Sequence, residues 1–512
     1  MIKTKILLIH PQIRERAEHA PFGLLQIAAV SDALGHQVAV LDLNAHRIGL
    51  DAFRQEVRLD EWDVCGISAL SSQYKYVKPL LPIIRKERPN TLIVGGGGCF
   101  SSQPREMLRW NKELDVIVVG EGENTWIELL DVVYSKRFSE VRGLAYRDED
   151  GRVELTEPRP LIGMKDSGLF ENLDDLPFPA WELAPVEIYL QNSQLPLCPE
   201  TMRIGLRRIS ITHERGCPYQ CRFCSHLLQS CSDMSRVYGR KIVGPNMRWQ
   251  SAEYVVRHIK YLRQKYCVNF VSILDENFLV NTKRSLEFAD LMEKEGLSGL
   301  VRFGVLGHAN TVKPEVISKL KDVGLAYVSI GAESADQRVL NALKKNCKPE
   351  WIQNAFDTLI KYEVYPITTW MICSEDDLES ILATIRFWKR NQITCKPFFE
   401  TPYPGCKLYD DNKEKIIEQF LTDEEKEIVH NAKIKEDLEK AEEIKDKALE
   451  SYVSSLGDAT DLVVNLNPTF NDFEIVGLQE LMLKQDERMI TAWSKEKGRK
   501  NAEKREGEGS NF

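Results

Sequence analysis

Short apolar runs alternate with helical patterns along most of this chain, and no other feature of the sequence limits its fold as strongly. A continuous apolar run is typical of a strand that is covered on both faces. The segment that opens at Pro21-Phe22-Gly23 and ends at Gly35 has the helical pattern expected between two such strands. This first series predicts a doubly wound parallel sheet over residues 1–135, with strands at 6–9, 36–42, 64–68, 92–94 and 116–119.

A second series of the same kind begins near residue 206. Its strand and helix units predict an open, partial (β/α)6 barrel of the TIM type over residues 201–410, with its chemistry at the C-terminal ends of the strands. The fold class is therefore α/β. The expected barrel strands are 207–213, 269–275, 301–307, 326–331, 365–372 and 395–401.

Three further segments lack this alternation. Residues 136–200 predict a linker with a small hairpin around 148–151. A Glu/Lys-rich stretch at 424–450 predicts a mainly helical C-terminal region over 411–492, with its charges on a solvated helix face. Residues 493–512, rich in Lys, Glu and Gly, predict a disordered tail.

The composition argues against several classes of protein. A formal net charge of −9 disfavours nucleic-acid partners, which usually bind a basic domain. No apolar run approaches the roughly 20 residues that span a bilayer, and the N-terminal stretch predicts a strand because it ends at His10-Pro11 without a cleavage site. We therefore expect a cytoplasmic protein without a membrane span, and its 12 cysteines are not expected to form a disulfide framework.

One group of cysteines is tightly spaced and follows the first expected barrel strand. Cys217, Cys221 and Cys224 lie within eight residues, and three such thiolates can wrap a 4Fe–4S cluster and leave one iron open for a small chelating cofactor. The alternative is a zinc site, which normally takes four ligands. Its additional ligands would come from His213, His226 and Cys231.

Serine, glycine and acidic residues follow three strands of the first expected sheet. Ligands of such sheets bind beyond the carboxyl ends of the strands, and glycine lets backbone N–H groups approach a ligand closely. The same residues also fit ordinary tight turns, so both interpretations stay open. No G-x-G-x-x-G follows the first strand, which disfavours a nicotinamide site. The candidate ligand-binding residues are Ser68, Ser71, Gly95, Gly96, Gly97, Gly120, Glu121 and Gly122.

The cysteine motif and several segments after it resemble the radical S-adenosylmethionine superfamily. The resemblance rests on the C-x-x-x-C-x-x-C spacing with an aromatic residue before the last cysteine, and on the T-P-Y-P-G segment at 401–405. It implies that Cys217, Cys221 and Cys224 are the catalytic cluster ligands. It also implies contacts to S-adenosylmethionine from Phe223, Asp275, Glu276, Glu333 and Ser334.

The N-terminal series, with its glycine-rich turns and G-E-G-E segment at 120–123, resembles the cobalamin-binding domain of the B12-dependent branch of that superfamily. The likeness covers residues 1 to about 410. Residues 371–376 depart from the G-x-P-G-E-T of many relatives, and His308 stands where relatives often have an arginine. His46 and Gly49 echo the H-x-x-G of other cobalamin methyltransferases, but they follow the second strand instead of the first, so His46 is not expected to bind cobalt.

The resemblance implies an oxygen-sensitive methyltransferase in which cleavage of S-adenosylmethionine gives a radical and methylcobalamin supplies a methyl group to an unactivated carbon. It suggests a protein or peptide substrate, for which glutamine in methyl-coenzyme M reductase is the leading candidate, or else a small molecule. The electron donor would be of the ferredoxin or flavodoxin type. The alternatives are a cobalamin-dependent cyclase or rearrangement enzyme, and a non-catalytic cobalamin or redox sensor.

Overall fold

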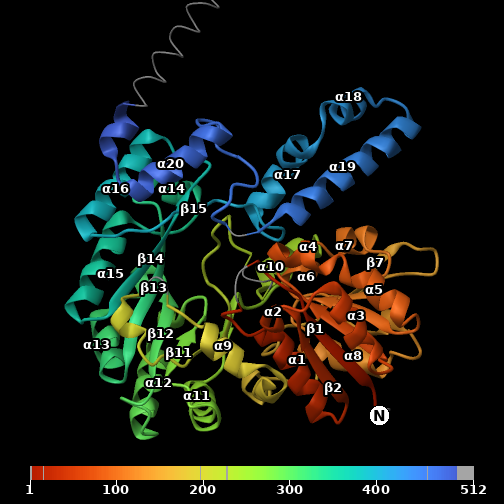
Figure 1. Ribbon diagram of the computed structural model, residues 1–512, viewed down its shortest axis with the longest axis horizontal. Coiled ribbons are helices and arrows are strands. Elements are labelled where there is room, and N and C mark those ends of the chain that lie inside the picture. Colours follow the sequence, from red (N-terminus) through yellow and green to blue (C-terminus); the bar gives the residue numbers. More distant parts are fainter. Residues whose placement is uncertain (1–2, 15–16, 196–197, 226–228, 458, 493–512) are drawn as a thin grey trace, which may run out of the picture.

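A computed structural model of the protein describes residues 3–14, 17–195, 198–225, 229–457 and 459–492. Two sheets form its framework and face each other across the middle of the molecule (Figure 1). The expected disordered tail, 493–512, and the zinc-ligand candidate His226 lie outside these residues. Among the described residues, no helix is long and apolar enough to cross a membrane.

The N-terminal sheet has seven strands in the order β2-β1-β3-β4-β5-β6-β7. Its first five strands are parallel, as the alternation of apolar runs and helices predicts. They are β1 (Lys5–His10), β2 (Gln37–Asp42), β3 (Val64–Ser68), β4 (Leu92–Gly96) and β5 (Val116–Val118).

The segment expected as a linker extends this sheet. β6 (Leu144–Arg147) pairs antiparallel with β5, and β7 (Val153–Leu155) completes the hairpin expected around 148–151. The rest of the segment includes 3-10 turns at Leu173–Asp175 and Trp181–Leu183 and leads to α9 (Val186–Asn192). It connects the two cores, because Leu173 packs on the N-terminal sheet and Trp181 packs in the barrel core.

Helices cover both faces of the N-terminal sheet. α1 (Phe22–Ala33) and α8 (Glu123–Asp131) pack on the face formed by Ile6 and Leu8. The opposite face, formed by Leu7 and Ile9, is covered by α3 (Leu50–Arg58), α5 (Leu80–Glu87) and α7 (Pro104–Trp110). The short helices α2 (Leu43–His46), α4 (Tyr74–Val77) and α6 (Gly98–Ser101) follow strand ends.

The second sheet is an open barrel of six parallel strands that lie in chain order. The fold agrees with the expected partial barrel, because a helix on the outer face stands between each strand and the next. The strands are β8 (Arg208–Ile211), β11 (Phe270–Ile273), β12 (Arg302–Gly307), β13 (Leu325–Glu333), β14 (Tyr365–Ile372) and β15 (Phe398–Phe399). The helices are α11 (Ala252–Tyr266), α12 (Thr282–Lys294), α13 (Pro314–Asp322), α14 (Gln337–Ala342), α15 (Pro349–Lys361) and α16 (Leu378–Asn391).

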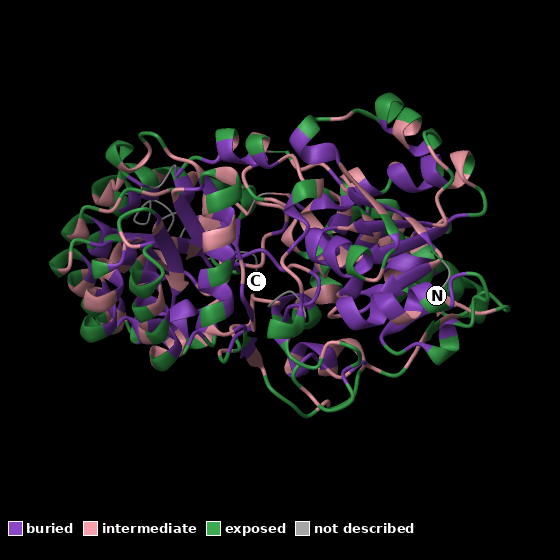
Figure 2. Cartoon of the chain, turned by 90° about the horizontal axis from the view of Figure 1, so that it is seen from below, coloured by how far each residue is buried: buried purple, intermediate pink, exposed green. Residues whose placement is uncertain are grey.

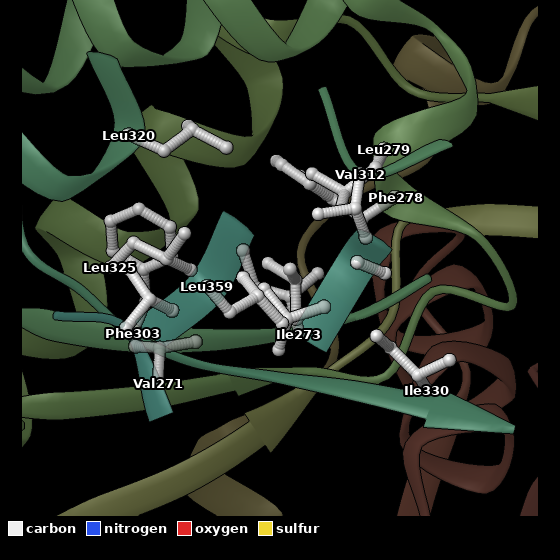
Figure 3. Packing of buried hydrophobic residues seen from close by; sticks show 14 of the residues in the cluster. Val271, Ile273, Phe278, Leu279, Phe303, Val312, Leu320, Leu325, Ile330 and Leu359 are labelled. Carbon is white, nitrogen blue, oxygen red and sulfur yellow. The ribbon is translucent and has the colours of Figure 1, made fainter. Parts of the chain in front are cut away.

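The barrel core lies between the strands and these helices, where Val271, Ile273 and Phe303 meet Leu320 and Leu359 (Figure 3). Figure 2 shows the strands of both sheets as the buried interior and exposed residues on the outer helices. A small antiparallel pair, β9 (Glu214–Gly216) and β10 (Met247–Trp249), follows β8, and α10 (Cys231–Val237) precedes β10.

The C-terminal helices are divided between the two sheets. α17 (Lys407–Phe420), α18 (Asp423–Asn431) and α19 (Lys435–Ser455) lie over the N-terminal sheet, and the C-terminal half of α19 enters its core (Figure 1). α20 (Asp472–Lys484) packs on the barrel core through Ile475, Leu478 and Met482. The stretch expected as one helix at 424–450 is two helices. The segment before α20 also covers the short edge strand β15, since Phe399 N donates to Ala459 O at 2.7 Å.

Glycine at position 304 is required by packing inside the barrel. Gly304 pairs with Tyr327 of the next strand, and a Cβ at Gly304 would lie 2.1 Å from the Tyr327 ring. That ring cannot move freely, because it stacks on Phe270 and its hydroxyl lies 2.8 Å from Ser272 Oγ.

We therefore expect Gly304→Ala to lower the free energy of unfolding by about 1–3 kcal/mol, the usual cost of overpacking a core. Denaturant unfolding of the full chain measures it. The matched control is Gly477→Ala in α20, where a Cβ meets nothing within 4 Å and should be neutral or slightly stabilising. Equal stability of the two variants would contradict the packing argument.

Candidate active site between the two sheets

A cavity of about 710 Å³ separates the carboxyl ends of the two sheets. Its walls come from the strand ends of both, so a ligand inside it touches both. The N-terminal wall includes His10, Asn44, Ser68, Ala69, Leu70, Gly96, Gly97, Gly98, Gly120, Glu121 and Gly122. The barrel wall includes Thr212, His213, Glu214, Arg215 and Leu274.

Most of the expected ligand-binding residues of the first sheet line this cavity. Gly97 has φ +78°, and a Cβ there would lie 2.9 Å from Ala69 O and Ser68 Oγ, so only glycine lets the backbone lie this close. Two of the expected residues do not line the cavity. The ring of Phe100 packs against Gly95, where a Cβ would lie 2.7 Å from that ring. Ser71 begins a 3-10 turn (Ser71–Gln73).

Glu121, an expected cofactor contact, lines the cavity and also belongs to an ion-pair network between the domains. Its carboxylate lies 2.7 Å from Arg248 and 3.2 Å from Arg215, and it accepts a hydrogen bond from Ile162 N at 2.9 Å. Arg215 also binds Glu123 at 2.5 Å. Burial opposes ionisation of Glu121, but the two arginines outweigh it and lower the pKa of this carboxyl.

Two histidines that the sequence did not single out line the cavity. His10 ends β1, and burial lowers its pKa despite the nearby Asp42. His19 is exposed to the cavity, with Nδ1 2.8 Å from Ser210 Oγ, and burial together with Arg208 lowers its pKa to about 4. Both rings are therefore neutral at pH 7. His46 is exposed and is not among the residues that line the cavity.

The cysteine loop follows β9 on the barrel side of the cavity. Cys217 is buried, and Cys221 and Cys224 are half-buried. Gly216 must precede the loop, because it has φ +79° and a Cβ there would lie 2.1 Å from Asn246 O. Three thiols on one shielded loop fit the donor set of a 4Fe–4S cluster that keeps one open iron.

A mononuclear zinc site is disfavoured by the partners of its proposed ligands. The His213 ring nitrogens lie 2.5 Å from Gln250 Oε1 and 3.1 Å from His258 Nδ1. Cys231 is buried, 3.8 Å from the Met164 sulfur. Within the described ranges, no three His, Cys, Asp or Glu side chains come together to hold a single metal ion.

Asp275, an expected contact of S-adenosylmethionine, has partners within the protein on both carboxylate oxygens. One accepts from His213 N at 2.5 Å and the other lies 3.2 Å from Arg284. Beside it, burial and the charge of Asp275 raise the pKa of Glu214 well above its usual range. Asp275 therefore ties together the loops that follow β8 and β11. The next residue, Glu276, is half-buried and is therefore more accessible than the fully buried Asp275.

Glu333 lies at the end of β13 in the left-handed region, with φ +63°. It is buried, and Lys345 Nζ lies 2.8 Å from its carboxylate. Glycine at position 331 leaves room for this pair, because a Cβ at that position would lie 2.4 Å from the Glu333 carboxylate. The ammonium group of Lys345 lies 5.8 Å from the centre of the Phe223 ring, so a buried cation stands beside the cysteine loop. Ser334 is buried next to this pair.

Arg222, inside the cysteine motif, anchors the loop to the barrel. Its guanidinium lies 2.6 Å from Glu375, 3.2 Å from Glu400 and 2.5 Å from Ser374 Oγ. Its backbone N–H donates to Leu343 O at 3.0 Å. Ser374 and Glu375 belong to the segment that departs from G-x-P-G-E-T. In this chain they bind Arg222 and thereby hold the cysteine loop against the barrel.

Sequence reasoning missed Arg215, Arg248, Lys345 and Arg222. Arg222 alone carried a local signal, because it lies between two cysteines of the motif. The partners of the others are distant in sequence, and no short pattern connects Arg215 with Glu121.

Comparisons with known proteins agree with this arrangement. Residues 15–130 match the B12 binding domain, and residues 211–387 match the radical SAM superfamily. An uncharacterized methyltransferase of Pyrococcus horikoshii is 28% identical over 415 residues, which are 79% of this chain and 82% of that protein. The anaerobic magnesium-protoporphyrin IX monomethyl ester cyclase of Rubrivivax gelatinosus is 25% identical over 432 residues, 80% of this chain and 70% of its own.

Among solved structures, the radical S-adenosylmethionine methyltransferase TsrM from Kitasatospora setae, determined with cobalamin and a [4Fe-4S] cluster bound, has a TM-score of 0.64 at 16% identity. The alignment covers 81% of this chain and 78% of that one. At this identity the likeness establishes the shared fold.

Arg222→Met should weaken retention of the cluster. The substitution removes the cation between Glu375 and Glu400 and frees the cysteine loop from the ends of β14 and β15, and loss of such a supporting contact typically costs about tenfold or more in metal affinity. Iron release to a chelator from the anaerobically reconstituted chain measures the effect. Arg386→Met is the matched control, because Arg386 lies 3.3 Å from Glu487 on the exposed surface, away from the cysteine loop. Equal iron release from both variants would refute the anchoring role.

Proposed function

Because this chain is an enzyme that joins a B12-binding domain to a radical SAM domain, we propose that it transfers a methyl group from S-adenosylmethionine through cobalamin to an unactivated carbon. Cys217, Cys221 and Cys224 would hold the cluster, and the cavity between the sheets would hold cobalamin. When bound, the cluster supplies the electron that cleaves S-adenosylmethionine to a 5′-deoxyadenosyl radical, and cobalamin supplies the methyl group.

The observation that supports this proposal best is the single cavity shared by both domains. One wall carries the glycine-rich ends of β4 and β5, and the other carries the residues between β8 and the cysteine loop. A methyl donor on the first wall would therefore face a radical generated at the second. The main contribution of a protein to such chemistry is to hold the reacting groups close together in the correct orientation.

The chain's own groups would orient the reactants and keep water out. The ion pairs of Arg215 with Glu121 and Glu123 fix the two walls relative to each other. Glu333, Ser334, Phe223 and Glu276 are the groups beside the cysteine loop that we propose as contacts of S-adenosylmethionine. Asp275 would act indirectly, because its hydrogen bond from His213 N sets the position of the loop after β8.

For the acceptor we propose a carbon of a protein or peptide, with the glutamine of methyl-coenzyme M reductase as the specific candidate. The exposed helices α18 and α19 offer a surface for such a substrate, since Ile434 and Leu438 are 62% and 50% exposed there. A cyclase is the second candidate, because the magnesium-protoporphyrin cyclase relative matches 80% of this chain.

The decisive experiment is anaerobic incubation of the reconstituted chain with cobalamin, a reductant, labelled S-adenosylmethionine and a glutamine-containing peptide. Methyl transfer predicts equal amounts of 5′-deoxyadenosine and S-adenosylhomocysteine and a labelled peptide. 5′-Deoxyadenosine without S-adenosylhomocysteine would favour the cyclase, and absence of both would favour a sensor.

Variants of single cysteines sharpen this experiment. Cys221→Ala should abolish 5′-deoxyadenosine formation, because it removes one of the three proposed cluster ligands. Cys267→Ala is the control, since Cys267 is exposed at the end of α11 and should leave both products unchanged. Full activity of the Cys221 variant would overturn the assignment of the cluster.

A further inference from the structure

The segment 343–348, which follows α14, forms the surface beside the cysteine loop. Leu343 O accepts from Arg222 N at 3.0 Å, so the segment is bound directly to the cysteine motif. On its other side Lys345 O lies 3.1 Å from His308 Nε2, and the His308 ring stacks on Tyr219 of the cysteine loop at 4.2 Å. The loop and the segment therefore form one continuous surface.

This surface carries positive charge that nearby carboxylates do not neutralise. Lys345 is buried and paired with Glu333. Lys344 and Lys348, on either side of it, are exposed, and in the described part of the chain neither is within ion-pair distance of a carboxylate. Lys348 Nζ instead lies 5.5 Å from the centre of the Trp351 ring.

The other cations that adjoin the loop are already paired. Arg338 binds Asp377, and Lys407 binds Asp411, each at 2.6 Å. In a chain with a net charge of −9, Lys344 and Lys348 are thus a local exception. Exposed, unpaired charges of one sign attract a partner of the opposite sign and speed its association.

The backbone of this segment is held in an unusual conformation. Lys344 and Asn346 have φ +53° and +50°, in the left-handed region that residues other than glycine rarely adopt. Such conformations cost free energy and persist where the surrounding contacts hold them. Here the bonds of Leu343 and Lys345 on both sides do so, which presents Lys344 outward.

The same surface is where the cysteine loop comes nearest to solvent. Pro218 and Gln220 are exposed, and Cys221 and Cys224 are half-buried. Electron transfer between proteins slows steeply with distance, so a donor protein must dock at this edge of the loop. The interdomain cavity is the proposed site for the reactants, and it lies between the two sheets, apart from this edge of the loop.

We propose that Pro218, Gln220, Lys344 and Lys348 form the docking surface for an acidic one-electron donor protein. The inference rests on the proposed function, because the electron is needed to cleave S-adenosylmethionine. In the docked complex one electron leaves the reduced donor and enters the cluster, and no covalent bond forms or breaks. Glu333 neutralises buried Lys345, so the charge that the donor would meet is that of Lys344 and Lys348.

The test is the rate of cluster reduction, which needs neither cobalamin nor substrate. The reconstituted full chain is mixed anaerobically with reduced flavodoxin, an acidic donor, and the cluster absorbance is followed. We expect the variant with Lys344→Glu and Lys348→Glu to show a second-order rate at least about tenfold lower at low salt. The difference should shrink as salt rises, because salt screens exposed charges.

Two controls separate docking from other effects. Lys433→Glu with Lys440→Glu makes the same change in net charge on the exposed arm of α18 and α19, and its rate with flavodoxin should stay within about twofold of the unmodified chain. Reduction by dithionite, a small reagent, should be equally fast in all three proteins.

Equal flavodoxin rates in the two charge-reversal variants would overturn the docking surface, as would a parallel loss of dithionite reduction. The salt dependence of the unmodified chain gives a measurement that needs no variant, and a rate insensitive to salt would also overturn it. Failure of the unmodified chain to hold a cluster would instead refute the proposed function, and the docking inference with it.

Discussion

The arrangement of the cavity depends on the ion pairs between the two sheets, of which Arg215 makes two. Its guanidinium binds Glu121 and Glu123 at the end of β5, while its backbone belongs to β9 of the barrel side. Removing such charges from water costs free energy that their attraction only partly returns, so a buried pair contributes little net stability and acts mainly on geometry. The two walls of the cavity are positioned by this contact, and the distance between the proposed methyl donor and the cysteine loop follows from it.

Sequence patterns predicted the two sheets because strand periodicity is a local property. The parallel strands β1 to β5 and the six barrel strands lie within a few residues of their expected positions. The hairpin β6–β7 was expected, but its pairing with β5 was not, since nothing in residues 144–155 identifies the strand beside which they lie. Likewise the C-terminal helices were expected as one region. In the structure α17 and α19 pack on the N-terminal sheet, whereas α20 packs on the barrel.

The candidate site divides in the same way. The cysteine spacing is a local signal, and the glycines at strand ends follow from topology. Glu121 and Asp275 were expected to contact cofactors from their positions and from the family resemblance. The folded chain adds an arginine beside each, Arg215 in one case and Arg284 in the other. The sequence around a carboxylate at a strand end does not show whether the partner of that carboxylate is a cofactor or an arginine side chain. Ser374 and Glu375 show the converse, because their departure from the common motif is explained once Arg222 is seen between them.

The open barrel raises a problem that closed barrels avoid, because its last strand has an unpaired side. Here β15 has only two residues, and Ala459 O, in the segment before α20, accepts a hydrogen bond from Phe399 N. Unpaired strand edges are templates on which other chains add. The crossing of the polypeptide from α19 back to the barrel therefore shields the half-open sheet from self-association, a role separate from any chemistry at the opposite ends of the strands.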